Sequence, residues 1–81
     1  MSWKKALEDK WETVWTKGKF VPGLGYPDWI HVKKTSLIGE WEVGAKRKIN
    51  FETMNGHFLF FKGSDAKSKA NKFAEAYRRK Y

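Results

Sequence analysis

The apolar residues at the start of the chain have the spacing of an amphipathic helix. Large side chains recur every three or four residues, which would place them on one side of a helix: Trp3, Leu7, Trp11 and Val14. Ser2 is a residue type favoured just before a first helical turn, and Gly18 is one favoured just after a last turn. The pattern predicts a helix over residues 3–16.

A loop and two strands are expected next. Residues 18–28 contain three Gly and two Pro without any apolar period, which predicts an ordered loop. Residues 29–34 alternate between apolar and polar, which predicts a strand with Ile30 and Val32 on its apolar face. Residues 37–43 predict a second strand, interrupted at Gly39.

A long hairpin is predicted over residues 47–62. Its centre is Asn55-Gly56, the pair typical of a type I′ turn, because both central positions of that turn need positive φ. A two-residue turn there puts four apolar side chains on one face, which we expect to be core: Ile49, Phe51, Phe58 and Phe60. The other face is expected to be half-covered and carries Met54, Leu59 and Phe61.

Residues 65–81 predict a second helix, with Ser64 or Asp65 as its cap. Its apolar stripe keeps helical spacing throughout: Ala66, Ala70, Phe73, Ala74, Tyr77 and Tyr81. The whole chain, residues 1–81, is expected to be one α+β domain. In it, an antiparallel sheet of three or four strands would carry both helices on one face.

Composition supports a folded domain and excludes several kinds of site. Aromatic residues make up 17% of the chain, enough for a dense small core and too many for a disordered segment. There is no Cys, which excludes disulfides and Cys-based zinc sites, and two His are too few to predict a metal site. The first ten residues carry charges where a signal peptide needs an unbroken apolar stretch, and no apolar run is long enough to cross a bilayer. We therefore expect no metal, no membrane and a cytoplasmic location.

The charge of the chain is concentrated in its second half. Of the net charge of +8, residues 43–81 contribute ten Lys and Arg against three acidic residues, a balance of +7. Such asymmetry is typical of a surface that binds phosphate backbones, although a lysine-rich solvated helix face has the same composition. The candidate nucleic-acid contacts lie in one turn and in the last helix: Lys46, Arg47, Lys48, Lys67, Lys69, Lys72, Arg78, Arg79 and Lys80.

The loop before the first strand suggests a different function. It is the segment most apt to expose aromatic or apolar side chains to a partner protein, and the candidates are Phe20, Leu24, Tyr26 and Trp29. The alternative to nucleic-acid binding is therefore a small regulator or inhibitor that docks on an acidic protein with this loop or with its basic face.

The chain offers few residues for a catalytic hypothesis. The only acid–base candidates are His31, His57, Glu52 and Asp28, of which Glu52 and His57 would be diagonal neighbours on the predicted hairpin and fit a small ribonuclease. Gly23-Leu24-Gly25 lacks the third glycine and the strand–helix context of a dinucleotide site. We expect a binding protein without a cofactor or a small-molecule substrate.

The segment from Lys67 to Ala74, Lys-Ser-Lys-Ala-Asn-Lys-Phe-Ala, is similar to the Lys/Ala-rich helix start of the double-stranded RNA-binding domain. The predicted α-β-β-β-α order also resembles that family in outline. The resemblance implies shape-based binding of an RNA duplex through its phosphates. The chain lacks the family's Gly-Pro-x-His loop, and residues 29–43 do not fit its spacing.

Overall fold

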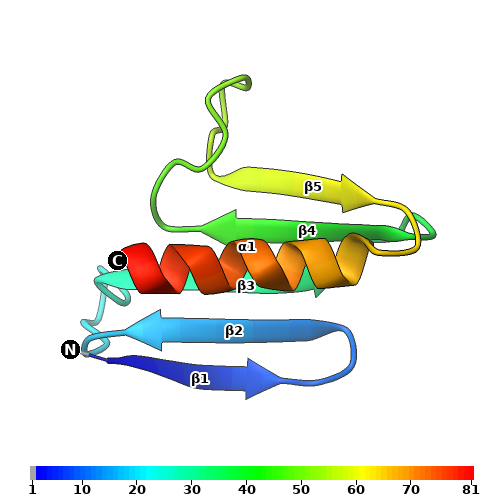
Figure 1. Cartoon of the computed structure of the whole chain (residues 1–81). Coiled ribbons are helices and arrows are strands. Elements are labelled where there is room, and N and C mark those ends of the chain that lie inside the picture. The colour runs from blue at the N-terminus through cyan, green and yellow to red at the C-terminus, as the bar shows by residue number, and fades with distance from the viewer. Residues whose placement is uncertain (1) are drawn as a thin grey trace.

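The computed structural model describes residues 2–81, which form one antiparallel sheet and one helix (Figure 1). The strands lie side by side in chain order as β1 (Trp3–Glu8), β2 (Glu12–Lys17), β3 (Asp28–Lys34), β4 (Glu40–Ala45) and β5 (Phe58–Lys62). Helix α1 (Ala66–Lys80) follows β5. The predicted α+β class, antiparallel sheet and carboxyl-terminal helix are confirmed, but the sheet has five strands, not three or four.

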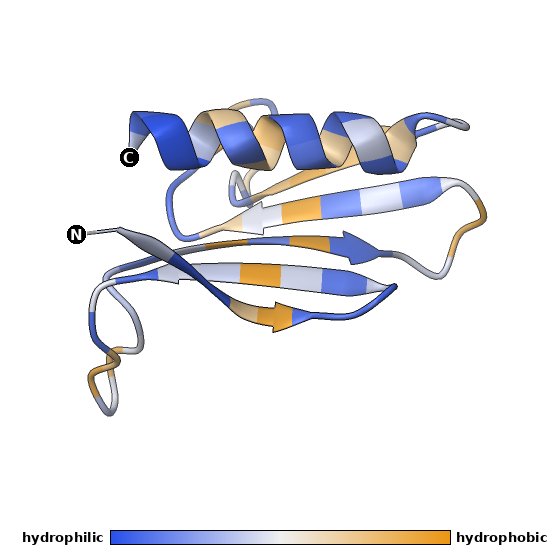
Figure 2. Ribbon diagram, turned by 60° about the horizontal axis from the view of Figure 1, so that its bottom comes forward, coloured by the Kyte–Doolittle hydropathy of each residue, from blue (hydrophilic) through white to orange (hydrophobic). Residues whose placement is uncertain are grey.

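Helix α1 covers one face of the sheet and packs on β3, β4 and β5 (Figures 1 and 2). The core lies between the two layers and is built from Trp15, Ile30, Val32, Val43, Ala45, Ala70, Ala74 and Tyr77. The fully buried residues of α1 are alanines, so its backbone lies close to the sheet while larger strand side chains fill the space between. Phe73 and Tyr81 pack at the border of this core, which confirms the predicted apolar stripe.

The predicted helix over residues 3–16 is wrong: this segment forms the β1–β2 hairpin. The Asp9 carboxylate makes the turn, because its Oδ1 accepts the main-chain N–H groups of Trp11 and Glu12, each at 2.8 Å. Strand β2 contains Thr13, Val14, Trp15 and Thr16, residue types that favour strands.

The helical spacing of Trp3 and Leu7 is coincidental. A bulge between Lys5 and Leu7 shifts the register, so Trp3 lies on the face that packs under α1 and Leu7 lies on the opposite face. Without an amino-terminal helix, the element order no longer resembles that of the double-stranded RNA-binding domain.

The predicted hairpin over residues 47–62 is also wrong. Strand β5 pairs with β4, with Phe61 opposite Trp41, and residues 46–57 form the loop between them. Neither Asn55 nor Gly56 has the positive φ of a type I′ turn. The Gly56 carbonyl instead accepts the N–H groups of Ile49 and Asn50, at 2.6 and 2.8 Å.

This pairing reverses the predicted faces of residues 58–62. Phe61, predicted to be half-covered, packs against the core beside Phe73, because β5 turns it toward α1. Of the predicted core residues, Ile49 packs at the core border and Phe58 is half-buried on the other face. Phe51 and Phe60 are 85% and 51% exposed.

Two strand predictions and the prediction of the carboxyl-terminal helix are confirmed. Strand β3 buries Ile30 and Val32 as expected, and the strand expected at residues 37–43 is β4, which begins after Gly39. Gly39 has φ +73°, so it ends the preceding turn rather than interrupting a strand. Asp65 occupies the N-cap position of α1 but makes no capping hydrogen bond through its side chain.

The sheet face away from α1 carries an aromatic row formed by Trp29, His31 and Phe58. The Trp29 and His31 rings are stacked, with centroids 5.7 Å apart and planes at 13°, and the centroid of Phe58 lies 6.2 Å from that of His31. His31 Nε2 lies 2.7 Å from Glu42 Oε2, which holds the imidazole in place. Gly44, opposite His31 on β4, leaves the space that this ring occupies.

We expect Gly44→Ala to lower the free energy of unfolding by about 1–3 kcal/mol. The new Cβ would lie 2.5 Å from His31 Cε1 and 2.9 Å from Phe58 Cε1, so the aromatic row must shift. Urea denaturation measures the loss. The same substitution in a His31→Ala background should cost less, because the closest ring is gone; an equal cost in both backgrounds would contradict this packing.

Candidate functional site

The three consecutive cations after β4 lie in three different environments. Lys46 lines a shallow depression with Leu24 and Tyr26. Arg47 forms an ion pair with Asp28, and Lys48 lines a groove beside Lys80 of α1. The predicted Lys46–Lys48 cluster is therefore divided, and of the three only Lys48 lines the groove beside α1.

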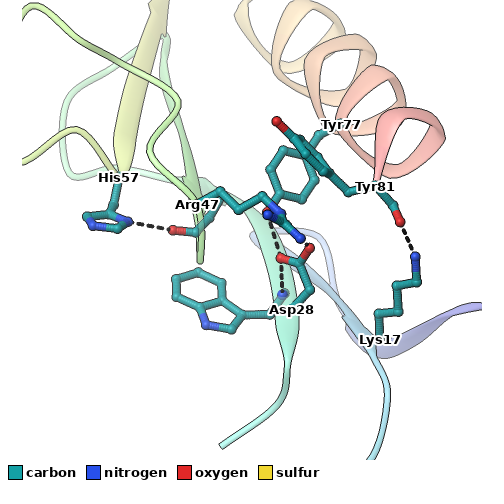
Figure 3. A network of polar contacts seen from close by, with 8 residues as sticks. Lys17, Asp28, Arg47, His57, Tyr77 and Tyr81 are labelled. Carbon is teal, nitrogen blue, oxygen red and sulfur yellow. Dashed lines mark hydrogen bonds and ion pairs between the residues drawn. The ribbon is translucent and has the colours of Figure 1, made fainter. Parts of the chain in front are cut away.

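Arg47 belongs to a polar network around the buried carboxylate of Asp28 (Figure 3). The Tyr77 hydroxyl of α1 donates to Asp28 Oδ1 at 2.6 Å, and Arg47 Nε donates to Oδ2 at 3.1 Å. The Arg47 guanidinium also lies 4.2 Å from the centroid of the Tyr81 ring. The network joins the start of β3, the segment after β4 and the last turn of α1.

Burial and the hydrogen bond to Asp28 raise the pKa of the Tyr77 hydroxyl above its usual value, which further favours the protonated form that donates to the carboxylate. The hydrogen bond to the same carboxylate raises the pKa of Arg47. Lys17 Nζ donates to the main-chain oxygen of Tyr81, which adds a contact from β2 to the end of the helix (Figure 3).

Four exposed cations of α1 lie along its outer side and on the flank toward the 46–57 loop. Together with Lys48 they form what we call the basic strip, which comprises Lys48, Lys69, Lys72, Arg79 and Lys80. From Lys69 to Lys80 the helix rises about 16 Å. Figure 2 shows that hydrophilic residues dominate the side of α1 turned away from the sheet.

Two cations of the strip have acidic partners within the helix. Lys69 Nζ lies 3.3 Å from Asp65 Oδ2, and Arg79 Nη2 lies 2.5 Å from Glu75 Oε1. Both pairs are exposed, so each is worth about 1 kcal/mol or less and can be exchanged for a phosphate contact. Lys48, Lys72 and Lys80 form no ion pair within residues 2–81.

Lys67 and Arg78 lie on the opposite flank of α1, and both pack on tryptophans of the sheet. Lys67 Nζ lies 5.2 Å from the ring centroid of Trp41, and the Arg78 guanidinium lies 3.9 Å from that of Trp15. Burial lowers the pKa of Arg78. These two cations contribute to the attachment of the helix and are separate from the basic strip.

A groove with a volume of about 310 Å³ lies between α1 and the 46–57 loop. Two lysines line it, Lys48 from the loop and Lys80 from the helix. The rest of its lining is apolar or aromatic: Ile49, Phe51, Phe73, Ala76, Tyr77 and Tyr81. The groove thus combines aromatic surfaces with two cations from distant parts of the chain.

The residues predicted for protein binding do not form one surface. Phe20 and Leu24 are 60% and 76% exposed in the loop between β2 and β3, which projects away from α1 (Figure 2). Tyr26 is half-buried and its ring makes an edge contact with Phe20, at 5.4 Å between centroids. Trp29 lies in β3 and belongs to the aromatic row.

The residues of the catalytic hypothesis are dispersed. Glu52 and His57 are not cross-strand neighbours, because the hairpin that would pair them does not form. His57 Nδ1 lies 3.2 Å from the Ala45 carbonyl oxygen. Asp28 is hydrogen-bonded to Tyr77 and Arg47, and His31 contacts Glu42. Residues 2–81 contain no group of three or more His, Asp or Glu side chains that could hold a metal ion.

The comparisons with known proteins add no functional information. No family model, curated protein or solved structure matches this chain. Within the described residues, no helix is both long and apolar enough to cross a membrane.

Sequence reasoning identified the cations of the strip but missed the aromatic lining of the groove. Phe51 was expected in the core, and Phe73 and Tyr81 were expected only as part of the buried stripe. A signal that could have found the helix side of the groove is the spacing of Phe73, Ala76 and Lys80, which places all three on one flank of α1. The 46–57 loop lies against that flank and completes the groove. The predicted hairpin placed most of these residues in strands, so it did not include this loop.

We expect Asp28→Ala to lower the free energy of unfolding by about 2–4 kcal/mol, measured by urea denaturation. The substitution leaves the buried Tyr77 hydroxyl without its acceptor and Arg47 without its carboxylate. Glu75→Ala is the matched control, because it removes an exposed carboxylate–arginine pair and should cost less than about 1 kcal/mol. Equal costs would contradict the role of the network.

Proposed function

We propose that this protein is a small cytoplasmic module that binds nucleic acid through its basic strip and has no enzymatic activity. The observation that carries the proposal is the convergence of cations from two distant segments. Lys48 from the loop after β4 and Lys80 from the end of α1 line the same groove, and Lys69, Lys72 and Arg79 extend the positive surface along the helix.

The electrostatics of the strip favour a polyanion. Five cations face two acidic residues, Asp65 and Glu75, so the local balance is +3 within about 16 Å of helix. Each phosphate that a cation neutralises releases condensed counterions, which makes such binding favourable and dependent on salt. Contacts of this kind are made with phosphates rather than with base edges, so we expect a modest sequence preference.

The first experiment is a fluorescence anisotropy titration with duplex DNA, duplex RNA and single-stranded RNA at about 50 and 200 mM salt. Four phosphate contacts predict a loss of about two orders of magnitude in affinity over this range. Negligible binding to all three at the lower salt concentration would refute the proposal.

Charge reversal on the strip should weaken binding to every sequence. We expect Lys69→Glu with Lys72→Glu to lower affinity at least about tenfold and to reduce the salt slope by about 2. The matched control is Lys4→Glu with Lys10→Glu, the same change in net charge at two exposed positions outside α1. Equal losses in both variants would mean that net charge matters and the strip does not.

Protein binding is the second candidate function, supported by the sheet face that α1 leaves uncovered. An antiparallel sheet with one solvated face usually carries polar residues there. This face carries the aromatic row together with Leu7 and Phe60, which are 45% and 51% exposed. Its charged residues lie opposite residues of the other sign, since Lys33 is paired with both Glu12 and Glu42 and Lys62 is paired with Glu40, so the face suits a partner of low net charge.

The loop between β2 and β3 projects on the side of this face, and Leu24 is its most exposed apolar residue (Figure 2). We expect Leu24→Asp with Phe60→Asp to abolish capture of a protein partner in a pull-down while nucleic-acid affinity falls less than about threefold. A captured protein that both the original chain and this variant retain equally would exclude the uncovered face as its binding surface.

A further inference from the structure

We infer that the groove between α1 and the 46–57 loop binds one unpaired nucleobase, so that the protein prefers single-stranded or locally unpaired nucleic acid to a continuous duplex. This inference rests on the proposed function and specifies its ligand. It is supported by one observation: the exposed aromatic ring of Phe51 lines the same groove as Tyr81 and two lysines.

The exposure of Phe51 is the first step. Its side chain is 85% exposed although it lines a groove with other apolar groups, so it is available to a ligand and contributes little to the core. An aromatic ring in this position offers a flat apolar surface, and such surfaces bind nucleobases by stacking irrespective of sequence.

The aromatic side chains on the helix side of the groove are held by contacts with other residues. The Phe73 ring packs on Phe61 of β5, with centroids 6.2 Å apart, and Tyr81 packs on Tyr77 at 4.9 Å. Arg47, itself paired with Asp28, lies on the Tyr81 ring. A ligand that enters therefore meets aromatic groups already fixed by the core and by the Asp28 network.

The charges of the groove determine which planar ligand fits. Lys48 and Lys80 line it from its two sides, and no acidic side chain is among its lining residues. A neutral aromatic or an apolar peptide would leave both cations without a partner. A nucleotide within a chain fits better, because its base can stack while the phosphates on either side approach the lysines.

Size and accessibility favour an unpaired base. A volume of about 310 Å³ is at the lower end of small-ligand pockets and suits one base with its sugar. A base within a duplex is stacked between its neighbours and would have to be flipped out, at a cost of a few kcal/mol. An unpaired base enters without that cost.

The test uses an oligonucleotide of about 12 nucleotides with 2-aminopurine at its centre, as single-stranded DNA, as single-stranded RNA and as the matching duplexes. We expect each single strand to bind about tenfold or more tightly than its duplex and its fluorescence to change on binding as the base stacks. Comparison of the two single strands shows whether the groove accepts DNA, RNA or both.

Phe51→Ala is the decisive variant. Because the Phe51 side chain is exposed, the variant should keep the fold, and circular dichroism checks this. We expect it to lower single-strand affinity about tenfold, to suppress the 2-aminopurine signal and to leave duplex affinity unchanged. The matched control is Phe20→Ala, which removes an exposed phenyl ring from the loop on the other side of the sheet and should change neither.

The outcomes separate the two proposals. The proposed base-binding role of the groove would be overturned by equal binding of single strands and duplexes, or by a single-strand preference that Phe51→Ala leaves intact. The basic strip would then remain as the proposed nucleic-acid surface. Absence of binding to every oligonucleotide at about 50 mM salt would overturn the proposed function and this inference together.

Discussion

The Asp28 carboxylate is the point at which the parts of this small protein are joined. It is buried at the start of β3, where it accepts hydrogen bonds from Tyr77 of α1 and from Arg47 after β4. A buried charge is tolerated only when it is paired and hydrogen-bonded, so the end of the helix and the segment after β4 must both lie close to it. This requirement positions the last turn of α1, and with it one side of the candidate groove.

The site depends on the same constraint. Arg47 pairs with Asp28, whereas its neighbours Lys46 and Lys48 line two different surfaces, and Lys48 lines the groove opposite α1. The alanines of α1 let the helix lie close to the sheet, so its longer cations remain outside the core. Arg47 is thus held in an ion pair with Asp28, while the cations of the basic strip stay at the surface because the helix face toward the sheet consists of small residues.

The two faces of the sheet differ in what they offer to a partner. The α1 side presents the basic strip and a groove with aromatic walls, a combination that suits a polyanion with flat bases. The opposite side presents the aromatic row and cross-strand pairs of opposite charge, which suit a less charged partner. One sheet therefore separates two surfaces of different chemistry, which substitutions on each side can test independently.

The sequence by itself determined the local features whose signal does not depend on distant partners. The period of α1, its apolar stripe, the alternation of β3 and the concentration of cations in the second half all follow from residues close together in the chain. Tertiary structure decided the rest. The spacing of Trp3, Leu7, Trp11 and Val14 fits a helix, but the Asp9 turn and the bulge after Lys5 place these residues in a hairpin.

Asn55-Gly56 has the composition of a tight turn, yet β5 pairs with β4, where Phe61 lies beside Trp41 and packs under α1. Which strands pair depends on segments far apart in the sequence. Here the burial of Phe61 against α1 favours the pairing of β5 with β4. The 46–57 loop, and with it the groove, exists only because of this pairing.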